Sequence, residues 1–340
     1  MLNLLARGTP SLLQYGISAL NTAPPSLRTV TLPPRCAQST ETSTRPMPRP
    51  PAVSGLVENP RTKIRSASYT RIMEEAEITG RYEVTNVIGA SGTVAMQRLL
   101  NEEGADDVMM MMGLGVVGAT YTFDSQARAG DATPLALMVE EQEGVLVPGD
   151  SEFETIDDLV EAWQADPGGI NVGGGSAPGG PDHLFPMELA REVGVQPSKV
   201  NYISYDGGGP LTSALLGAKI DVGTSGLGEF EGQIADGELR VLAVSGRERL
   251  EGIDAPTLQE SGIDLTFTNW RGFLAPPGIS DEARDELIGM LVELHGTPEW
   301  EQALVDNGWT DAFATGVEFE EFLVEQNERV ETTLEELGLA

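Results

Sequence analysis

The stretch Ile170-Asn-Val-Gly-Gly-Gly-Ser-Ala-Pro-Gly-Gly-Pro-Asp-His-Leu184 decides the fold predicted for this chain. It begins as a short apolar strand over residues 170–173, passes through a glycine-rich loop and continues as a helix over residues 182–193. Pro181 suits the first helical turn because the N–H group that proline lacks would have no partner there. The first N–H groups of a helix are unpaired and its dipole is positive at that end, so this loop is typical of an anion-binding site.

The alternation of short strands and helices continues on both sides of this loop. Apolar runs predict further strands at residues 82–87, 107–112, 135–147, 200–205, 220–224 and 239–244. Helices are predicted at residues 69–76, 94–103, 156–165, 211–216, 229–236, 281–295 and 317–337, with Thr155 as the N-cap of the third. This alternation predicts parallel sheets covered by helices on both faces. Ligands of such sheets bind beyond the carboxyl ends of the strands.

Several of the predicted strands run into glycine-rich loops. These loops lie at residues 89–92, 113–115, 173–180, 207–209 and 223–226. Glycine lets the backbone turn sharply and approach a ligand closely, and it exposes N–H donors that carry no positive charge. Any one of these loops could be an ordinary tight turn. Five of them after five strands favour a shared cleft.

Length and charge narrow the class of protein. The chain has 340 residues, which suits two lobes with separate cores, and no apolar run long enough for a membrane-spanning helix. Its net charge is -32. Residues 1–65 hold eight basic and two acidic residues, which leaves 13 basic and 51 acidic residues in the rest of the chain. A body this acidic repels nucleic acid and anionic lipid, so we expect neither as a partner.

Residues 1–65 differ from the rest and are predicted to be a disordered or aberrant segment. They contain many prolines and no sustained hydrophobic period. Residues 2–20 are weakly apolar and interrupted by Arg7 and Pro10, so they form no convincing signal peptide. The single cysteine, Cys36, follows Pro-Pro-Arg, whereas a lipid-attachment signal has small and apolar residues there. We expect an inert thiol, with lipidation as the alternative.

An ordered set of motifs resembles one receptor family. The motifs are Val84-Thr-Asn-Val-Ile-Gly-Ala-Ser-Gly-Thr-Val-Ala95, Gly179-Gly-Pro-Asp-His-Leu184, Tyr205-Asp-Gly-Gly-Gly-Pro-Leu211, Leu215-Leu-Gly-Ala-Lys-Ile-Asp-Val222, Gly237-Glu-Leu-Arg-Val-Leu-Ala-Val244, Asp254-Ala-Pro-Thr-Leu258 and Trp270-Arg-Gly-Phe-Leu-Ala-Pro-Pro-Gly278. In this order, over residues 66–340, they resemble the substrate-binding receptors of tripartite tricarboxylate transporters (the Bug/TctC-like family).

The resemblance implies an α/β, two-lobed type II periplasmic-binding-protein fold. Lobe one would comprise residues 66–145 plus 268–340, and lobe two residues 146–267. It also implies a monomeric, extracytoplasmic solute-binding receptor that closes on a small carboxylate, such as a di- or tricarboxylate or an amino-acid-like acid. Such a receptor delivers its ligand to membrane permease subunits, and it has no cofactor and no enzymatic activity.

Carried over residue by residue, the resemblance also implies ligand contacts. In lobe two they are Ser176, Gly179, Gly180, Asp206, Thr224 and Ser225, and in lobe one Ser91, Gly92, Gly113 and Gly115. Many members of the family carry Asp at the position of Ser225, so the ligand class of this chain can differ. Members also begin with a strand and a Pro-Gly-Gly-Gly-like loop. Here Arg65 is followed at once by Ser66 and a predicted helix, so that strand and loop are predicted to be missing. A truncated relic that binds nothing is therefore one alternative.

A second alternative is a Rossmann-type nicotinamide-dependent oxidoreductase. The run Gly113-Leu-Gly-Val-Val-Gly118 has the spacing G-x-G-x-x-G and follows an apolar run. That motif should open a helix, and an acidic residue should follow about 20 residues later. Residues 119–123 are instead rich in β-forming residues, and Asp124 comes too early. We therefore expect no nicotinamide cofactor.

Few residues offer other chemistry. The chain has no G-x-S-x-G motif, no metal-binding spacing and only two histidines, His183 and His295. His183 lies in the first turn of the predicted helix, where it either contacts a ligand or packs and caps. Arg271 either pairs with a ligand carboxylate or anchors the return crossing between the lobes, and the second role is favoured.

Overall fold

The computed structural model describes residues 52–53, 69, 71–76, 78 and 84–340, and the structural statements below concern these residues. They belong to a compact unit that spans Pro48–Ala340. Cys36, the weakly apolar stretch at residues 2–20 and the proline-rich segment before residue 52 lie outside the described residues. The predictions made for them stay predictions.

One long strand, β3 (Thr133–Pro148), runs through both halves of a mixed sheet. Its first part pairs antiparallel with β8 (Thr268–Ala275) and β9 (Thr310–Thr315). Its second part pairs antiparallel with β6 (Val222–Gly226) and β7 (Leu239–Val244). Pairing with β8 ends at Gln142 and pairing with β6 begins at Glu143. The chain therefore passes from one half of the sheet to the other at that peptide bond.

The remaining strands extend each half of the sheet. β2 (Val108–Gly113) pairs antiparallel with β8, and β1 (Ala52–Val53) pairs parallel with β2. In the other half, β4 (Asn171–Gly174) lies between β6 and β5 (Asn201–Ser204) and is parallel to both. The prediction of parallel sheets is therefore right for β4, β5 and β6. It is wrong for β2, β3, β8 and β9, because the two long connecting strands run in opposite directions.

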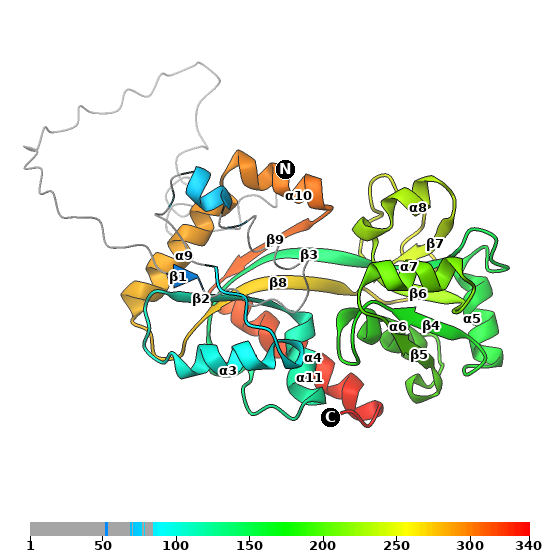
Figure 1. The fold of residues 1–340 in the computed structure, drawn as a ribbon, viewed down its shortest axis with the longest axis horizontal. Coiled ribbons are helices and arrows are strands. Elements are labelled where there is room, and N and C mark those ends of the chain that lie inside the picture. Colours follow the sequence, from blue (N-terminus) through cyan, green and yellow to red (C-terminus); the bar gives the residue numbers. More distant parts are fainter. Residues whose placement is uncertain (1–51, 54–68, 70, 77, 79–83) are drawn as a thin grey trace, which may run out of the picture. The chain divides into compact units, whose positions relative to one another are not determined.

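Helices cover both faces of these strands. The α-helices are α3 (Thr93–Asn101), α4 (Leu114–Thr122), α5 (Ile156–Ala165), α6 (Pro181–Glu192), α7 (Gly208–Leu216), α8 (Glu231–Ala235), α9 (Asp281–His295), α10 (Pro298–Asn307) and α11 (Val317–Glu336). Short 3-10 helices are η1 (Ala90–Gly92), η2 (Ala129–Asp131), η3 (Pro197–Lys199) and η4 (Leu227–Glu229). Figure 1 shows α9 and α10 on one side of β3 and β8, and α3, α4 and α11 on the other. No helix of the described part is long and apolar enough to cross a membrane.

Local sequence signals place several of these helices accurately. α5 has its predicted bounds, and the Thr155 hydroxyl accepts a hydrogen bond from the Asp158 N–H at 3.3 Å. The Asp158 carboxylate accepts one in return from the Thr155 N–H at 2.8 Å, which completes a capping box. The strand predicted at residues 82–87 is wrong where it can be seen, because residues 84–87 form only a single bridge at Val87.

The prediction of a missing first strand and loop falls largely on residues 54–68, outside the described residues. The strand β1, which consists of Ala52 and Val53 and precedes residues 54–68, lies beside β2. Part of the segment predicted to be disordered or aberrant thus contributes a strand. The lobe boundaries at residues 145 and 268 lie close to the point where β3 changes partners and to the start of β8, and they stay predictions.

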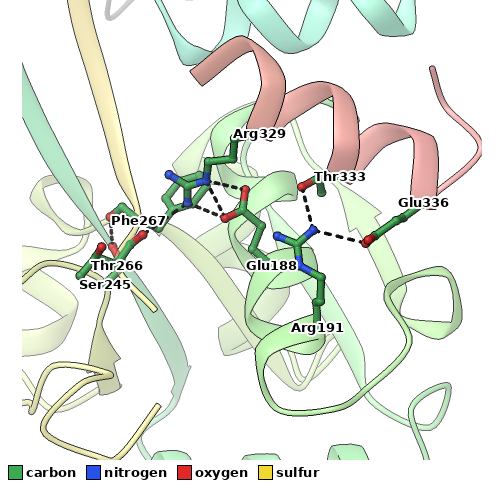
Figure 2. A network of polar contacts seen from close by, with 8 residues as sticks. All are labelled: Glu188, Arg191, Ser245, Thr266, Phe267, Arg329, Thr333 and Glu336. Carbon is green, nitrogen blue, oxygen red and sulfur yellow. Dashed lines mark hydrogen bonds and ion pairs between the residues drawn. The ribbon is translucent and has the colours of Figure 1, made fainter. Parts of the chain in front are cut away.

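A buried ion pair joins α11 to α6 beside the connecting strands (Figure 2). The Arg329 guanidinium donates to both carboxylate oxygens of Glu188, with Nε–Oε1 at 3.0 Å and Nη2–Oε2 at 2.5 Å. It also lies 4.8 Å from the centre of the Phe267 ring. The Glu188 side chain is 2% exposed. Burial raises the pKa of this carboxyl group, and Arg329 acts in the opposite direction.

We expect Arg329→Met to destabilise the protein by about 3–5 kcal/mol, because it leaves the Glu188 carboxylate buried without its cation. The double variant Arg329→Met/Glu188→Leu should recover most of that loss. Arg249→Met, which breaks an exposed pair with Glu260, should cost no more than about 1 kcal/mol. Denaturant unfolding of the three variants measures these differences. Equal losses in Arg329→Met and Arg249→Met would contradict the assigned role of burial.

Candidate functional site

The first half of α4 packs directly against the loop that precedes α6. A Cβ atom built at Gly118 would lie 1.8 Å from the carbonyl oxygen of Gly179, and one built at Gly115 would lie 3.7 Å from Cδ of Pro181. Backbone therefore meets backbone here, which only glycine permits. Two of the glycine loops expected to form a shared cleft, at residues 113–115 and 173–180, lie side by side.

A third glycine loop joins them through α4. Residues 89–92 all have positive φ angles, of 139°, 42°, 51° and 91° in order. Ala90 and Ser91 have left-handed backbone that residues with side chains rarely adopt, and such strain is enriched at ligand sites. A Cβ atom at Gly92 would lie 2.8 Å from Cγ2 of Val116. The predicted contacts Ser91 and Gly92 are thus adjacent to α4. They approach it at Val116, about one helical turn after Gly113.

The start of α6 is held by hydrogen bonds within the chain. The Gly175 N–H donates to Oδ2 of Asp182 at 2.7 Å, and the Asp182 N–H donates to the Ser176 hydroxyl at 3.1 Å. The N–H groups of Gly179 and Gly180 donate to His183 Nδ1 and to the carbonyl of Ala177. The predicted contacts Ser176, Gly179 and Gly180 therefore lie together before α6. The N–H groups of Gly179 and Gly180 already donate within the loop, and the Ser176 hydroxyl accepts from the Asp182 N–H.

The start of α4 differs from the start of α6 in its capping and its charge. No side chain caps it, and its first turn contains no acidic residue. α6 carries Asp182 in its first turn. The unpaired N–H groups and the positive end of the dipole at residues 114–116 therefore remain the better place for an anion.

Two buried acids lie beside these helix starts. Glu143, on β3 at the crossing between the sheet halves, is 0% exposed, and Asp182 is 7% exposed. Neither carboxylate oxygen of Glu143 has a hydrogen-bond partner in the described part of the chain. Burial raises the pKa of Glu143 well above its usual value, and the charges of Asp182 and Glu141 raise it further. Burial also raises the pKa of Asp182, to about 6.

Polar groups on β8 face the same acids. Arg271 lowers the pKa of Glu143 by its charge, and the nearby Asn269 amide also lowers it. The Arg271 guanidinium donates to Oδ1 of Asn269, and to the carbonyl of Trp270 at 2.8 Å. Arg271 therefore helps to anchor the β8 crossing, as the sequence favoured, and at the same time provides positive charge at the site.

The last predicted contacts divide into two groups. Thr224 and Ser225, at the end of β6, are buried against the start of α6; the Thr224 hydroxyl donates to the Asp182 carbonyl at 2.8 Å. Asp206 is exposed in a loop that is tied to the site by a 3.0 Å hydrogen bond from the Gly207 N–H to the Gly175 carbonyl.

Sequence reasoning missed Glu143 and Asp182. The acids at residues 140, 141 and 143, inside an otherwise apolar predicted strand, were the available signal.

Both histidines make contacts within the chain. His183 is 5% exposed, accepts from the Gly179 N–H at 3.1 Å and packs edge-on against Tyr202. Burial lowers its pKa to about 4, so it is neutral at pH 7. His295 contacts Asp311 and stacks on Phe313 at the end of α9. No cluster of three metal-ligating side chains occurs among the residues described.

The G-x-G-x-x-G run does open a helix, so the prediction of β-structure at residues 119–123 is wrong; packing of α4 outweighs the local propensity. The rest of a dinucleotide site does not follow. After α4 the chain enters β3, which pairs with β8 and not with β2, and β2 itself is antiparallel to β8. A Rossmann unit needs a parallel pair joined by the helix.

Comparison with known proteins gives a consistent result. A family model described as "Tripartite tricarboxylate transporter family receptor" matches residues 77–339. The UPF0065 protein of the gbd 5′ region of Cupriavidus necator is 28% identical over 200 residues, 58% of this chain and 59% of that protein. A UPF0065 protein of Bordetella bronchiseptica is 24% identical over 62% of each chain. The chain thus spans about three fifths of the length of these curated relatives.

Solved structures share the fold. A TctC solute-binding protein from Polaromonas, without ligand, is 22% identical with a TM-score of 0.71, over 86% of this chain and 100% of its own. MatC of Rhodopseudomonas palustris, solved with malate, is 18% identical with a TM-score of 0.67, over 83% and 98%. Rpa4515 of R. palustris, solved with adipate, is 18% identical with a TM-score of 0.70, over 86% and 98%. The two-lobed fold expected from the sequence is therefore confirmed.

We expect Gly118→Ala to weaken the packing of α4 on the loop at residues 177–180, because its Cβ atom would overlap the Gly179 carbonyl. The melting temperature should fall by several degrees, and ligand affinity should fall with it. Gly289→Ala is the matched control: this glycine is also helical, and its Cβ atom would meet nothing within 4 Å. That variant should keep or raise the melting temperature. Unchanged stability and affinity in Gly118→Ala would contradict the contact.

We expect Glu143→Gln to stabilise the protein at pH 8 by about 1–3 kcal/mol. The folded-state pKa of Glu143 is raised above its unfolded value, so the folded state binds more protons and wild-type stability falls as pH rises from about 4.5 through the raised pKa. The glutamine variant does not undergo this loss, and its advantage should disappear toward pH 4.5. Thermal unfolding between pH 4.5 and 8 measures it, with the exposed Glu152→Gln as control. Lower stability of Glu143→Gln at pH 8 would show that the carboxylate is paired.

Proposed function

This chain belongs to the tripartite tricarboxylate transporter receptor family, and we propose that it binds a small carboxylate between two lobes and presents it to the permease subunits of such a transporter. The observation that carries this proposal is the convergence of three glycine loops on the uncapped start of α4. In this geometry the ligand carboxylate accepts hydrogen bonds from N–H groups at residues 114–116. The helix dipole contributes about 0.3–2 kcal/mol to binding.

The shared strands β3 and β8 support closure as the binding motion. Both strands connect the two halves of the sheet, and bending at residues 142–143 of β3 and near residue 268 of β8 would move one half toward the other. Closing would bring the start of α4 against the loop before α6, as it lies in this structure. We propose that the protein acts outside the cytoplasm as a monomer and performs no chemistry on its ligand.

Malate and adipate, the ligands solved with two structural relatives, suggest where to begin the search. Their low identity to this chain supports the fold and leaves the ligand open. The net charge of the chain makes charge attraction over long distance unfavourable for any anion. Recognition must then come from groups that touch the carboxylate.

We expect titration calorimetry of the full chain to detect binding of at least one small carboxylate from a panel of mono-, di-, tri- and amino-carboxylates, and none of NAD. Gly115→Pro should abolish that binding, because it removes an N–H group from the start of α4 where a helix tolerates proline. Circular dichroism should show the variant folded. If no carboxylate of the panel binds, or if NAD binds in their place, the receptor proposal is wrong.

A further inference from the structure

We propose that the ligand is an amino-carboxylate, whose carboxylate group binds at the start of α4 and whose ammonium group is neutralised by Glu143 and Asp182. This inference rests on the proposed receptor function and names the chemical class of its ligand. Glu143 is then the residue that sets specificity. No motif in the sequence assigned it a role.

The burial of Glu143 is the first observation. A fully buried carboxylate with two oxygens that lack hydrogen-bond partners is costly to a protein, and such groups occur where a cation or donor is supplied. Asp182 is buried beside it, and its Oδ2 atom is held in place by the Gly175 N–H. These two side chains come from different elements, β3 and α6. Their meeting is a product of the tertiary fold and not of a run of acids in sequence.

The charges around Glu143 indicate the kind of ligand. Beyond burial, the charges of Asp182 on α6 and Glu141 on β3 raise the pKa of Glu143, and each disfavours another negative charge nearby. Burial raises the pKa of Tyr202 on β5, and the same acids, Asp182 and Glu143, raise it further, which keeps that phenol neutral. Arg271 and Asn269 on β8 oppose them. A dicarboxylate would add two negative charges to this mostly acidic group. An ammonium group would instead donate hydrogen bonds to carboxylate oxygens that the protein already holds in a dry interior.

The two helix starts give the ligand its direction. α4 begins without a capping side chain or an acid, whereas α6 begins with Asp182. They are neighbours, since a Cβ atom at Gly115 would lie 3.7 Å from Pro181. One small molecule with a carboxylate and an ammonium group on the same carbon atom would reach both. The carboxylate is attracted to the uncapped dipole and the ammonium to the acidic side.

Three matched pairs of compounds test this inference by calorimetry on the full chain. They are L-alanine and propionate, L-glutamate and glutarate, and L-phenylalanine and 3-phenylpropionate, which differ within each pair only in the α-ammonium group. We expect the amino compound of at least one pair to bind at least about tenfold more tightly than its partner. Glu143→Gln should reduce that affinity about tenfold or more and leave the partner acid unchanged or more tightly bound.

Glu140→Gln is the control, because Glu140 lies on the same strand with its side chain on the opposite face, beside Thr268. It should leave both affinities unchanged. If in none of the three pairs the amino compound binds more tightly than its partner, while some carboxylate of the wider panel binds, the inference is wrong and the receptor function stands. The inference is equally wrong if Glu143→Gln affects both members of a pair alike. If none of the six compounds and no other carboxylate of the wider panel binds, the receptor function itself falls.

Discussion

The close approach of α4 to the loop before α6 is the contact on which the site depends. With glycine at positions 118 and 179, the helix backbone touches the loop backbone, and any larger residue would hold them apart. This contact brings together an uncapped helix start, a strained loop at residues 89–92 and a buried acid at the start of α6. An isolated glycine loop would offer weak and unspecific donors. Three loops against one another form the candidate binding site.

The connecting strands and α11 fix the halves of the sheet on which these loops lie. β3 and β8 share their hydrogen bonds up to Gln142, after which β3 pairs with β6. The Arg329–Glu188 pair lies beside this transition and joins α11 to α6 (Figure 2). A buried charge pair is a weak source of net stability, but removal of one partner is costly, so it specifies one arrangement of the two helices.

Local signals in the sequence predicted local structure well. Thr155 and Asp158 specify the start of α5 through their own hydrogen bonds, and no distant residue is needed. β8 was not predicted because its partners lie over a hundred residues away and its polar members, such as Asn269, hide its strand character. Likewise, the β-forming residues at 119–123 become helical because α4 is packed on η1 and α11. The glycine loops were found from sequence, but which of their N–H groups remain available for a ligand depends on tertiary hydrogen bonds.

The same distinction explains why the acids of the site escaped sequence reasoning. In a chain with 53 acidic residues, nothing local separates Glu143 from acids that face solvent. Only the fold shows that this one is buried beside Asp182, whereas Glu140 on the same strand faces the other side. An acidic receptor that bound its ligand through lysines and arginines would have to place them against its own field. In the proposed site, a helix dipole would bind the carboxylate and a buried acid would bind the ammonium group, so the acidic chain would need no cluster of lysines and arginines.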